Sequence, residues 1–132
     1  MVSWLGVNLQ VPRVVLIMEL QQPDRDALRT LMDYFEYSAR DHLVTFSDFN
    51  ELIILKPVTL KNGTLNKSLE QHELQKFKHY AQSCGFSRLI VGGYFAGENG
   101  LRRSYQTAKS TQAMVKRLKL KHQFIFHDDY AL

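Results

Sequence analysis

The chain has 132 residues with 17 Lys and Arg against 13 Asp and Glu, and its single cysteine is Cys84. This length is typical of one domain with one hydrophobic core, so we expect a single domain over residues 1–132. One cysteine excludes an internal disulfide and a multi-cysteine zinc site, which favours a reducing, cytoplasmic compartment. No apolar run approaches the roughly 18 residues of a membrane-spanning helix, and the N-terminus lacks a signal-peptide pattern, so we expect no membrane partner.

The positive charge is concentrated in one segment. Between Gly100 and Lys121 the sequence contains no acidic residue and seven basic ones, which are Arg102, Arg103, Lys109, Lys116, Arg117, Lys119 and Lys121. The rest of the chain has 10 basic residues against all 13 acids. Such a helix either attracts nucleic acid or an acidic partner, or simply presents a solvated face.

Three of these bases, Arg102, Lys109 and Lys116, recur every seven residues. On a helix this spacing keeps them within about 20° of one line per step, so they predict a single outward stripe. A stripe of one sign is more stable with an acidic partner. We therefore predict a docking face, with solvent as the alternative, and the acids of a second copy (Asp33 and Glu36), a neighbouring domain or an anion as candidate partners.

The first half of the chain predicts a strand, a helix and a hairpin. Arg13–Leu20 is a continuous apolar, β-branched run typical of a central strand. Asp24 is placed to cap a helix whose apolar positions keep helical spacing at Leu28, Leu31, Met32, Phe35 and Ala39. His42–Phe46 and Leu52–Val58 are strand-like and are separated by a hairpin turn at Ser47–Glu51, so we expect them to be antiparallel.

The middle of the chain predicts a loop and a second helix. Thr59–Lys67 contains Asn-Gly and little apolar material, which predicts a flexible loop. Ser68 and Gln71 match a capping box, and Gly85 is a typical C-terminal stop. The apolar stripe between them consists of Leu74, Phe77, Ala81 and Cys84. Cys84 is therefore expected to be a small buried hydrophobe.

The last third predicts strand Ser87–Phe95, a helix beginning at Gly100 and strand His122–Asp128. The residues of this helix expected to face inward are Leu101, Tyr105, Ala108, Val115 and Leu118. The element order is then βαββαβαβ, which predicts an α+β fold: a mostly antiparallel five-stranded sheet with three helices and a ferredoxin-like start. This architecture alone assigns no function.

Two motifs near Gly100 invite a catalytic or anion-binding interpretation. Tyr105 and Lys109 have the Y-x-x-x-K spacing of short-chain dehydrogenases, but no glycine-rich turn follows the first strand, so we expect no catalysis there. The stretch Gly97–Arg103, with Gly97, Gly100, Arg102 and Arg103, resembles a phosphate cradle at a helix start without matching a Walker motif. The alternative to an anion site is that Gly92 and Gly93 permit close packing or a bulge, and that Gly97 and Gly100 shape the loop.

Metal ligands are sparse. His72 and His79 share a helix, and His127 and Asp129 stand at the last strand, but each pair is more typical of an exposed polar surface. We expect no metal site and no cofactor.

Four segments, taken together, are typical of one bacterial family. They are LGVNLQVPRVVLIMEL (Leu5–Leu20), LIILKP (Leu52–Pro57), VGGYFAGENGLRRSYQTAKST (Val91–Thr111) and FIFHDDYAL (Phe124–Leu132). The glycine-bearing strand, short loop and GLRRSYxxAK helix start are the most specific part. Over nearly its whole length the chain resembles the middle domain of bacterial carbohydrate diacid regulators.

The resemblance implies a degenerate GGDEF domain, the fold of diguanylate cyclases. In active cyclases the hairpin carries G-G-[DE]-E-F, whose glycines admit the nucleotide and whose acids hold metal. Here neither glycine is present, and the hairpin consists of Ser47, Asp48, Phe49, Asn50 and Glu51. Glu19 stands where the cyclases have a metal-binding aspartate, but alone it does not gather the two metals of phosphoryl transfer. We therefore expect no enzymatic activity.

The resemblance also implies a role. In that family a diacid-sensing domain precedes this module and a helix-turn-helix domain follows it, and we expect both to be absent from this chain, so that DNA is bound only through the helix-turn-helix domain. We expect a non-catalytic regulatory domain that acts through interdomain or homodimer contacts. The alternatives are a small-ligand module for a dicarboxylate or nucleotide at Gly97–Arg103, and residual cyclase activity.

Overall fold

The structure is a computed structural model that describes residues 10–48 and 50–130. These residues form a five-stranded sheet in the order β2-β3-β1-β6-β7. The strands are β1 (Arg13–Leu20), β2 (Leu43–Asp48), β3 (Glu51–Pro57), β6 (Phe86–Val91) and β7 (Phe124–Phe126). Only the β6–β7 pair is parallel within this sheet. The predicted α+β class and the ferredoxin-like strand order are confirmed.

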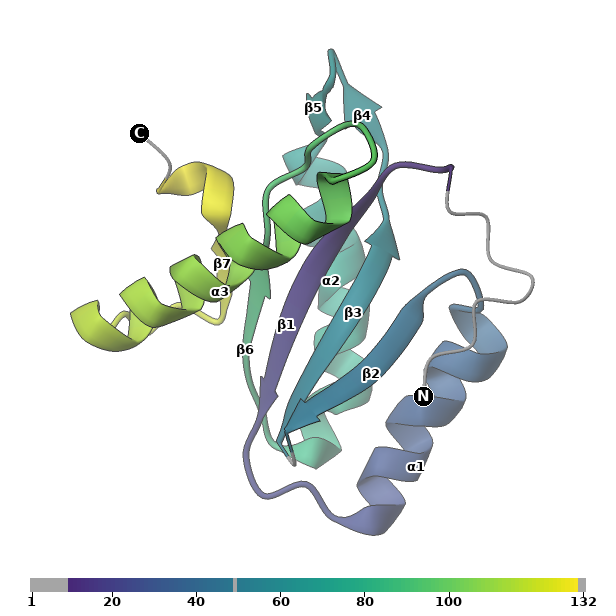
Figure 1. The fold of residues 1–132 in the computed structure, drawn as a ribbon. Helices are drawn as coiled ribbons and strands as arrows, with labels where there is room; N and C mark the ends of the chain where they lie inside the picture. The colour runs from purple at the N-terminus through teal and green to yellow at the C-terminus, as the bar shows by residue number, and fades with distance from the viewer. Residues whose placement is uncertain (1–9, 49, 131–132) are drawn as a thin grey trace.

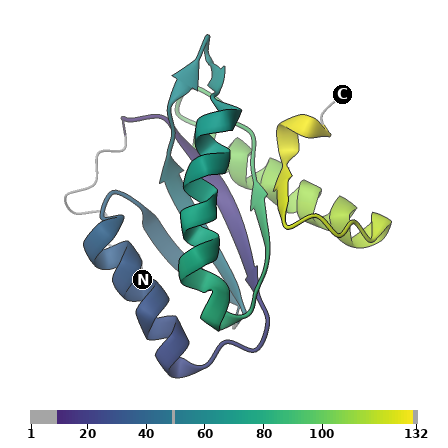
Figure 2. The ribbon, with the colours of Figure 1, turned by 180° about the vertical axis from the view of Figure 1, so that it is seen from behind.

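Helices cover both faces of the sheet. They are α1 (Arg25–Asp33), which continues into the π-helical turn η1 (Tyr34–Ser38), α2 (Lys67–Ala81) with the short turn η2 (Gln82–Cys84), and α3 (Gly100–Leu118). Figure 1 shows α3 crossing the near face of the sheet. Seen from behind, α2 lies over the strands with α1 beside it (Figure 2). A last turn, η3 (His127–Asp129), follows β7.

The central strand β1 supplies both layers of the core because its side chains alternate between the two faces. Leu16 and Met18 pack toward α1 and α2, whereas Val15 and Ile17 pack toward α3. Cys84 is buried in the first layer, as predicted. Among the described residues, no helix is both long enough and apolar enough to span a bilayer.

The helix boundaries confirm one predicted cap and correct another. Asp24 caps α1, accepting a hydrogen bond from the Ala27 backbone N–H at 2.8 Å. The Ser68 capping box is wrong, because the cap lies two residues earlier, at Asn66, whose side chain accepts a hydrogen bond from the Leu69 N–H at 3.3 Å. The predicted stop at Gly85 is confirmed, since its backbone adopts the left-handed conformation and it caps the C-terminal end of η2.

The predicted loop Thr59–Lys67 contains a small ribbon. It is formed by β4 (Leu60–Lys61) and β5 (Thr64–Leu65). Asn62 and Gly63 both have positive φ, 56° and 78°, as a tight hairpin turn requires. The Asn-Gly pair is therefore a hairpin signal here, and the flanking strands are only two residues long.

The inward face of α3 differs from the prediction. Tyr105 is 41% exposed and Leu118 is 56% exposed. The buried positions are Gly100, Ser104, Ala108, Thr111, Gln112 and Val115. Leu118 is the last residue of α3, and this end of the helix reaches past the sheet in Figure 1. The strand before α3 also ends earlier than predicted, at Val91 instead of Phe95.

Candidate functional site

The predicted anion site at Gly97–Arg103 is only partly assembled. Gly97 and Gly100 line a cavity of about 110 Å³ together with Tyr94 and Phe95. Neither Arg102 nor Arg103 lines it. The Arg103 guanidinium instead stacks on the Phe95 ring, 4.0 Å from the ring centroid. Anion binding here stays a prediction.

Gly92, which directly follows β6, allows α3 to approach the sheet closely. A Cβ atom on Gly92 would lie 2.3 Å from the Ser104 carbonyl oxygen. The Ser104 hydroxyl accepts a hydrogen bond from the Val15 N–H at 2.8 Å, and the Gly93 N–H donates to the Thr107 hydroxyl at 2.9 Å. The close-packing interpretation therefore accounts for Gly92, whereas the atoms nearest to a Cβ atom on Gly93 would belong to the Phe95 ring, at 3.1 Å, and to His127, at 3.2 Å, and not to α3.

Tyr105 and Lys109 do not form an acid–base pair in the structure. The Lys109 ammonium donates to the Gln112 Oε1 at 3.0 Å and lies 3.7 Å from a Glu51 carboxylate oxygen. Lys109 thus belongs to a cluster between α3 and the sheet. We define the Gln112 cluster as Glu19, Glu51, Arg88, Lys109 and Gln112.

Two carboxylates and one amide form the centre of this cluster. Glu19 on β1 and Glu51 on β3 are directly opposite each other in the antiparallel register. Gln112 on α3, only 3% exposed, places its amide nitrogen 2.8 Å from Glu19 Oε2 and 2.6 Å from Glu51 Oε2. A primary amide has two N–H donors, so each carboxylate receives one.

The outer carboxylate oxygens have their own partners. Arg88 on β6 approaches Glu19 Oε1 at 3.4 Å, and the Ser47 hydroxyl donates to Glu51 Oε1 at 2.7 Å. Burial alone would raise the pKa of the Glu51 carboxyl. The hydrogen bonds from Ser47 and Gln112 and the charge of Lys109 outweigh burial, so the pKa of Glu51 is lowered.

A cavity of about 260 Å³ adjoins the cluster. It brings together parts that the sequence separates: Glu19 from β1, Asp48, Asn50 and Glu51 from the hairpin, and Lys116 from α3. Two of the three docking-face bases, Lys109 and Lys116, therefore lie at this cluster. Phe49 of the predicted hairpin lies outside the described residues.

The metal of the cyclase fold does not fit this arrangement. The space between the two carboxylates holds the Gln112 amide, and Arg88 and Lys109 add positive charge at the outer oxygens. A divalent cation would have to displace the amide and lie close to two other cations. No three His, Cys, Asp or Glu side chains gather in metal-binding reach anywhere in the described ranges.

A second buried polar cluster lies on the other face of the sheet. Lys56 on β3 is 1% exposed, and its ammonium lies 2.8 Å from Glu70 and also contacts Glu73, both on α2. Burial raises the pKa of Glu70, against the opposing effect of Lys56. His42 lies nearby, bound to Asp41 at 2.9 Å, and burial lowers its pKa.

The predicted histidine pairs do not become ligand pairs. His127 contacts the Thr111 hydroxyl at 3.1 Å, while the Asp129 carboxylate accepts a hydrogen bond from the Lys67 ammonium at 2.6 Å. The two residues therefore have different partners. His72 and His79 both line an open groove of about 530 Å³ between η1 and α2, without a carboxylate in its lining. Both pairs serve as polar surface or as structural contacts.

Sequence reasoning missed Gln112, Arg88 and Lys56 as cluster members. The signal for Gln112 was its position four residues after Ala108 and three before Val115, both of which were expected to face inward. The signal for Lys56 was a charge inside the apolar run of β3, at a position on the same face of the strand as Leu52 and Ile54. Lys56 thus stands on an otherwise apolar face, whereas Gln112 shares the buried face of α3 with Ser104 and Thr111.

Comparison with known proteins adds the family. The family model of the GGDEF-like domain matches residues 2–114. The chain is also similar to the carbohydrate diacid regulator of Escherichia coli strain K12, with 30% identity over 139 aligned positions. The alignment covers 97% of this chain but only 35% of the relative, so the chain spans about a third of that regulator. No solved structure gives a significant match. Because the family model matches most of the chain and agrees with the fold, the chain belongs to the GGDEF-like domain family.

Proposed function

We propose that this chain is a non-catalytic regulatory domain of a cytoplasmic transcription regulator of the carbohydrate diacid type. It acts through contacts with other domains of the full-length protein or with a second copy. The similarity to a carbohydrate diacid regulator, of which the chain spans about a third, supports this role.

The observation that carries the proposal is the state of the hairpin between β2 and β3. Side chains stand where the cyclases need glycines, and Ser47 donates to Glu51, whose other oxygen accepts from Gln112. Glu51, one of the two acids of the hairpin, is thus committed to contacts within the chain. A metal ion would have to displace the Gln112 amide to reach Glu51, and the hairpin lacks the glycines that admit the nucleotide in the cyclases.

Catalysis is tested by incubating the chain with GTP and Mg²⁺ or Mn²⁺, with an active diguanylate cyclase domain as the positive control. We expect no cyclic dinucleotide. Detectable product above the protein-free control would contradict the non-catalytic assignment. We also expect no sequence-selective binding of operator DNA. Residual binding should be weak and fall steeply with salt, because it comes only from the basic residues of α3 and the segment after it.

The regulatory role is tested in the full-length regulator. Replacing this domain by a flexible linker should abolish the effector response while DNA binding by the other domain persists. An unchanged effector response would contradict the role. The alternative, a small-ligand module at Gly97–Arg103, is tested by calorimetry with dicarboxylates and guanine nucleotides. We expect no heat of binding, because the cavity at that loop is much smaller than the roughly 300 Å³ of typical ligand sites.

A further inference from the structure

The position of the Gln112 amide points to a function for this residue. The amide nitrogen lies between two carboxylates that come from neighbouring strands, at the end of the sheet where the hairpin begins. Its oxygen accepts from Lys109 on the same helix. The amide nitrogen and the amide oxygen of Gln112 therefore both have hydrogen-bond partners, and both carboxylates gain a partner without a metal ion.

We propose that the Gln112 amide substitutes for a divalent cation and forms a metal-independent clasp that holds α3 against β1 and β3. The clasp joins three elements far apart in the chain: β1 through Glu19, β3 through Glu51 and α3 through Gln112. This inference does not depend on the proposed regulatory role, because it concerns how the domain holds itself together.

The geometry carries a second consequence. The distances from the amide nitrogen to the two carboxylate oxygens are 2.8 and 2.6 Å. Neighbouring oxygen ligands of a hexacoordinate Mg²⁺ or Mn²⁺ ion are about 3 Å apart, since each lies about 2.1 Å from the ion. Replacing Gln112 by Glu therefore adds a third carboxylate at a spacing that such an ion requires, and the adjoining cavity of about 260 Å³ has room for its water ligands.

The test compares four proteins in Mn²⁺ and in EDTA: the parent, Gln112→Glu, Gln112→Ala and the matched control Gln106→Glu. Gln106 is exposed on the same helix, so the control makes the same chemical change away from the cluster. Thermal unfolding gives the melting temperature, and calorimetry with Mn²⁺ alone gives binding. The parent and Gln106→Glu should melt at the same temperature in both buffers.

Gln112→Glu should melt lower than the parent in EDTA, because three carboxylates then repel one another. Mn²⁺ should raise its melting temperature by about 5 °C or more and bind at one ion per chain. Gln112→Ala loses the clasp but keeps both carboxylates, so Mn²⁺ should restore part of its lost melting temperature. This second variant decides the matter if Gln112→Glu does not fold.

Two results would overturn the proposal. Stoichiometric Mn²⁺ binding by the parent would show that a cation, and not the amide, is the natural partner of the two glutamates. Melting temperatures of Gln112→Glu and Gln112→Ala that do not respond to Mn²⁺ would show that the carboxylates do not converge on one ion position.

Discussion

The two faces of the sheet each enclose a polar cluster, and the two clusters are built differently. Under α2, the Lys56 ammonium lies between two carboxylates of one helix, and both Lys56 and Glu70 are almost completely buried. Under α3, two carboxylates from neighbouring strands share the neutral amide of Gln112, and an open cavity lies beside them. On one face a cation lies between two acids, whereas on the other face a neutral amide lies between two acids.

The difference indicates what each cluster contributes. Lys56 and Glu70 are far from solvent, so their charges depend on each other and on Glu73, and removal of one partner leaves an uncompensated buried charge. The carboxylates of the Gln112 cluster keep about a sixth of their surface exposed, with Glu19 at 17% and Glu51 at 14%. The first cluster should mainly affect global stability, and the second should mainly affect the position of α3.

The largest effect is expected from breaking the buried ion pair. Lys56→Met should lower the free energy of unfolding by about 3–5 kcal/mol, because Glu70 then remains buried without its cation. The double variant Lys56→Met with Glu70→Met should recover most of this loss, since packed apolar side chains replace the pair. Urea unfolding followed by circular dichroism measures both. If Lys56→Met lost less unfolding free energy than the double variant, Glu70 would not depend on the charge of Lys56.

A second prediction separates the two faces. Gly92→Ala places a Cβ atom 2.3 Å from the Ser104 carbonyl oxygen, so α3 must shift away from the sheet. We expect a loss of about 1–3 kcal/mol, as for overpacked cores. Hydrogen exchange should show faster exchange for α3 amides, while α2 amides change only with global stability. Equal acceleration in both helices would mean that the two faces are not separable.

Much of the fold was predictable because local signals agreed with the final packing. The bounds of β1 match the predicted Arg13–Leu20, where an uninterrupted apolar run is buried on both faces. The Asp24 cap and the Gly85 stop are set by backbone chemistry within a few residues, which sequence displays directly. The Asn66 cap was missed because two polar residues close together, Asn66 and Ser68, each offered a cap.

The α3 face and the clusters were less predictable because they depend on distant residues. Tyr105 fits an apolar stripe by spacing, yet Ser104 takes the inner position because Gly92 admits a backbone approach that only a small side chain allows. The partners of Gln112 lie 93 and 61 residues away in sequence, so no local pattern reports them. The convergence of Glu19 and the hairpin was implied by the family resemblance, whereas the amide between the acids was not.

A third prediction uses pH to probe the α2 face. Burial lowers the pKa of His42 despite the opposing effect of Asp41, and Lys56 lowers it further. The unfolded chain therefore binds this proton more readily than the folded one. Stability should fall as the pH drops below about 6.5, by at most about 1.4 kcal/mol per pH unit from this group, until the folded His42 is also protonated. Urea midpoints of the parent and His42→Gln at several pH values should diverge toward acid, with the variant less sensitive. Parallel profiles would show that His42 does not titrate differently in the two states.

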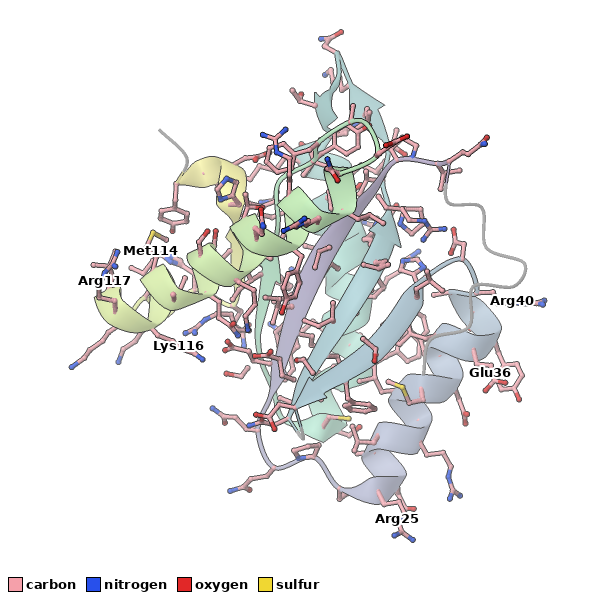
Figure 3. All side chains as sticks on the ribbon, in the orientation of Figure 1. Arg25, Glu36, Arg40, Met114, Lys116 and Arg117 are labelled. Atoms are coloured by element: carbon pink, nitrogen blue, oxygen red, sulfur yellow. The ribbon has the colours of Figure 1, made fainter. Side chains whose placement is uncertain are left out.

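The last prediction concerns the docking face formed by Arg102, Lys109 and Lys116. Replacing these bases should have the smallest effect on stability and the largest effect on association. Lys109 already has an acid of the same chain, Glu51, at 3.7 Å, and Lys116 lies at the same cavity, so part of the like-charge repulsion is relieved internally. Within one chain Lys116 of α3 and Glu36 of η1 lie at opposite sides of the molecule (Figure 3), so a contact between them requires a second copy.

Replacing these three bases by Gln should change the free energy of unfolding by less than about 1 kcal/mol, because exposed ion pairs contribute little. The matched control replaces Arg25, Arg29 and Arg40 by Gln, which removes the same charge from exposed positions on and just after the first helical segment. Sedimentation should show weaker self-association, or the full-length regulator a weaker effector response, only for the α3 variant. If both triple variants match the parent in association and in response, the α3 bases are a solvated face; if both weaken it equally, net charge and not this face controls association. A loss confined to the α3 variant is what the docking face predicts, since only there do the bases stand on one line beside the carboxylates of the Gln112 cluster.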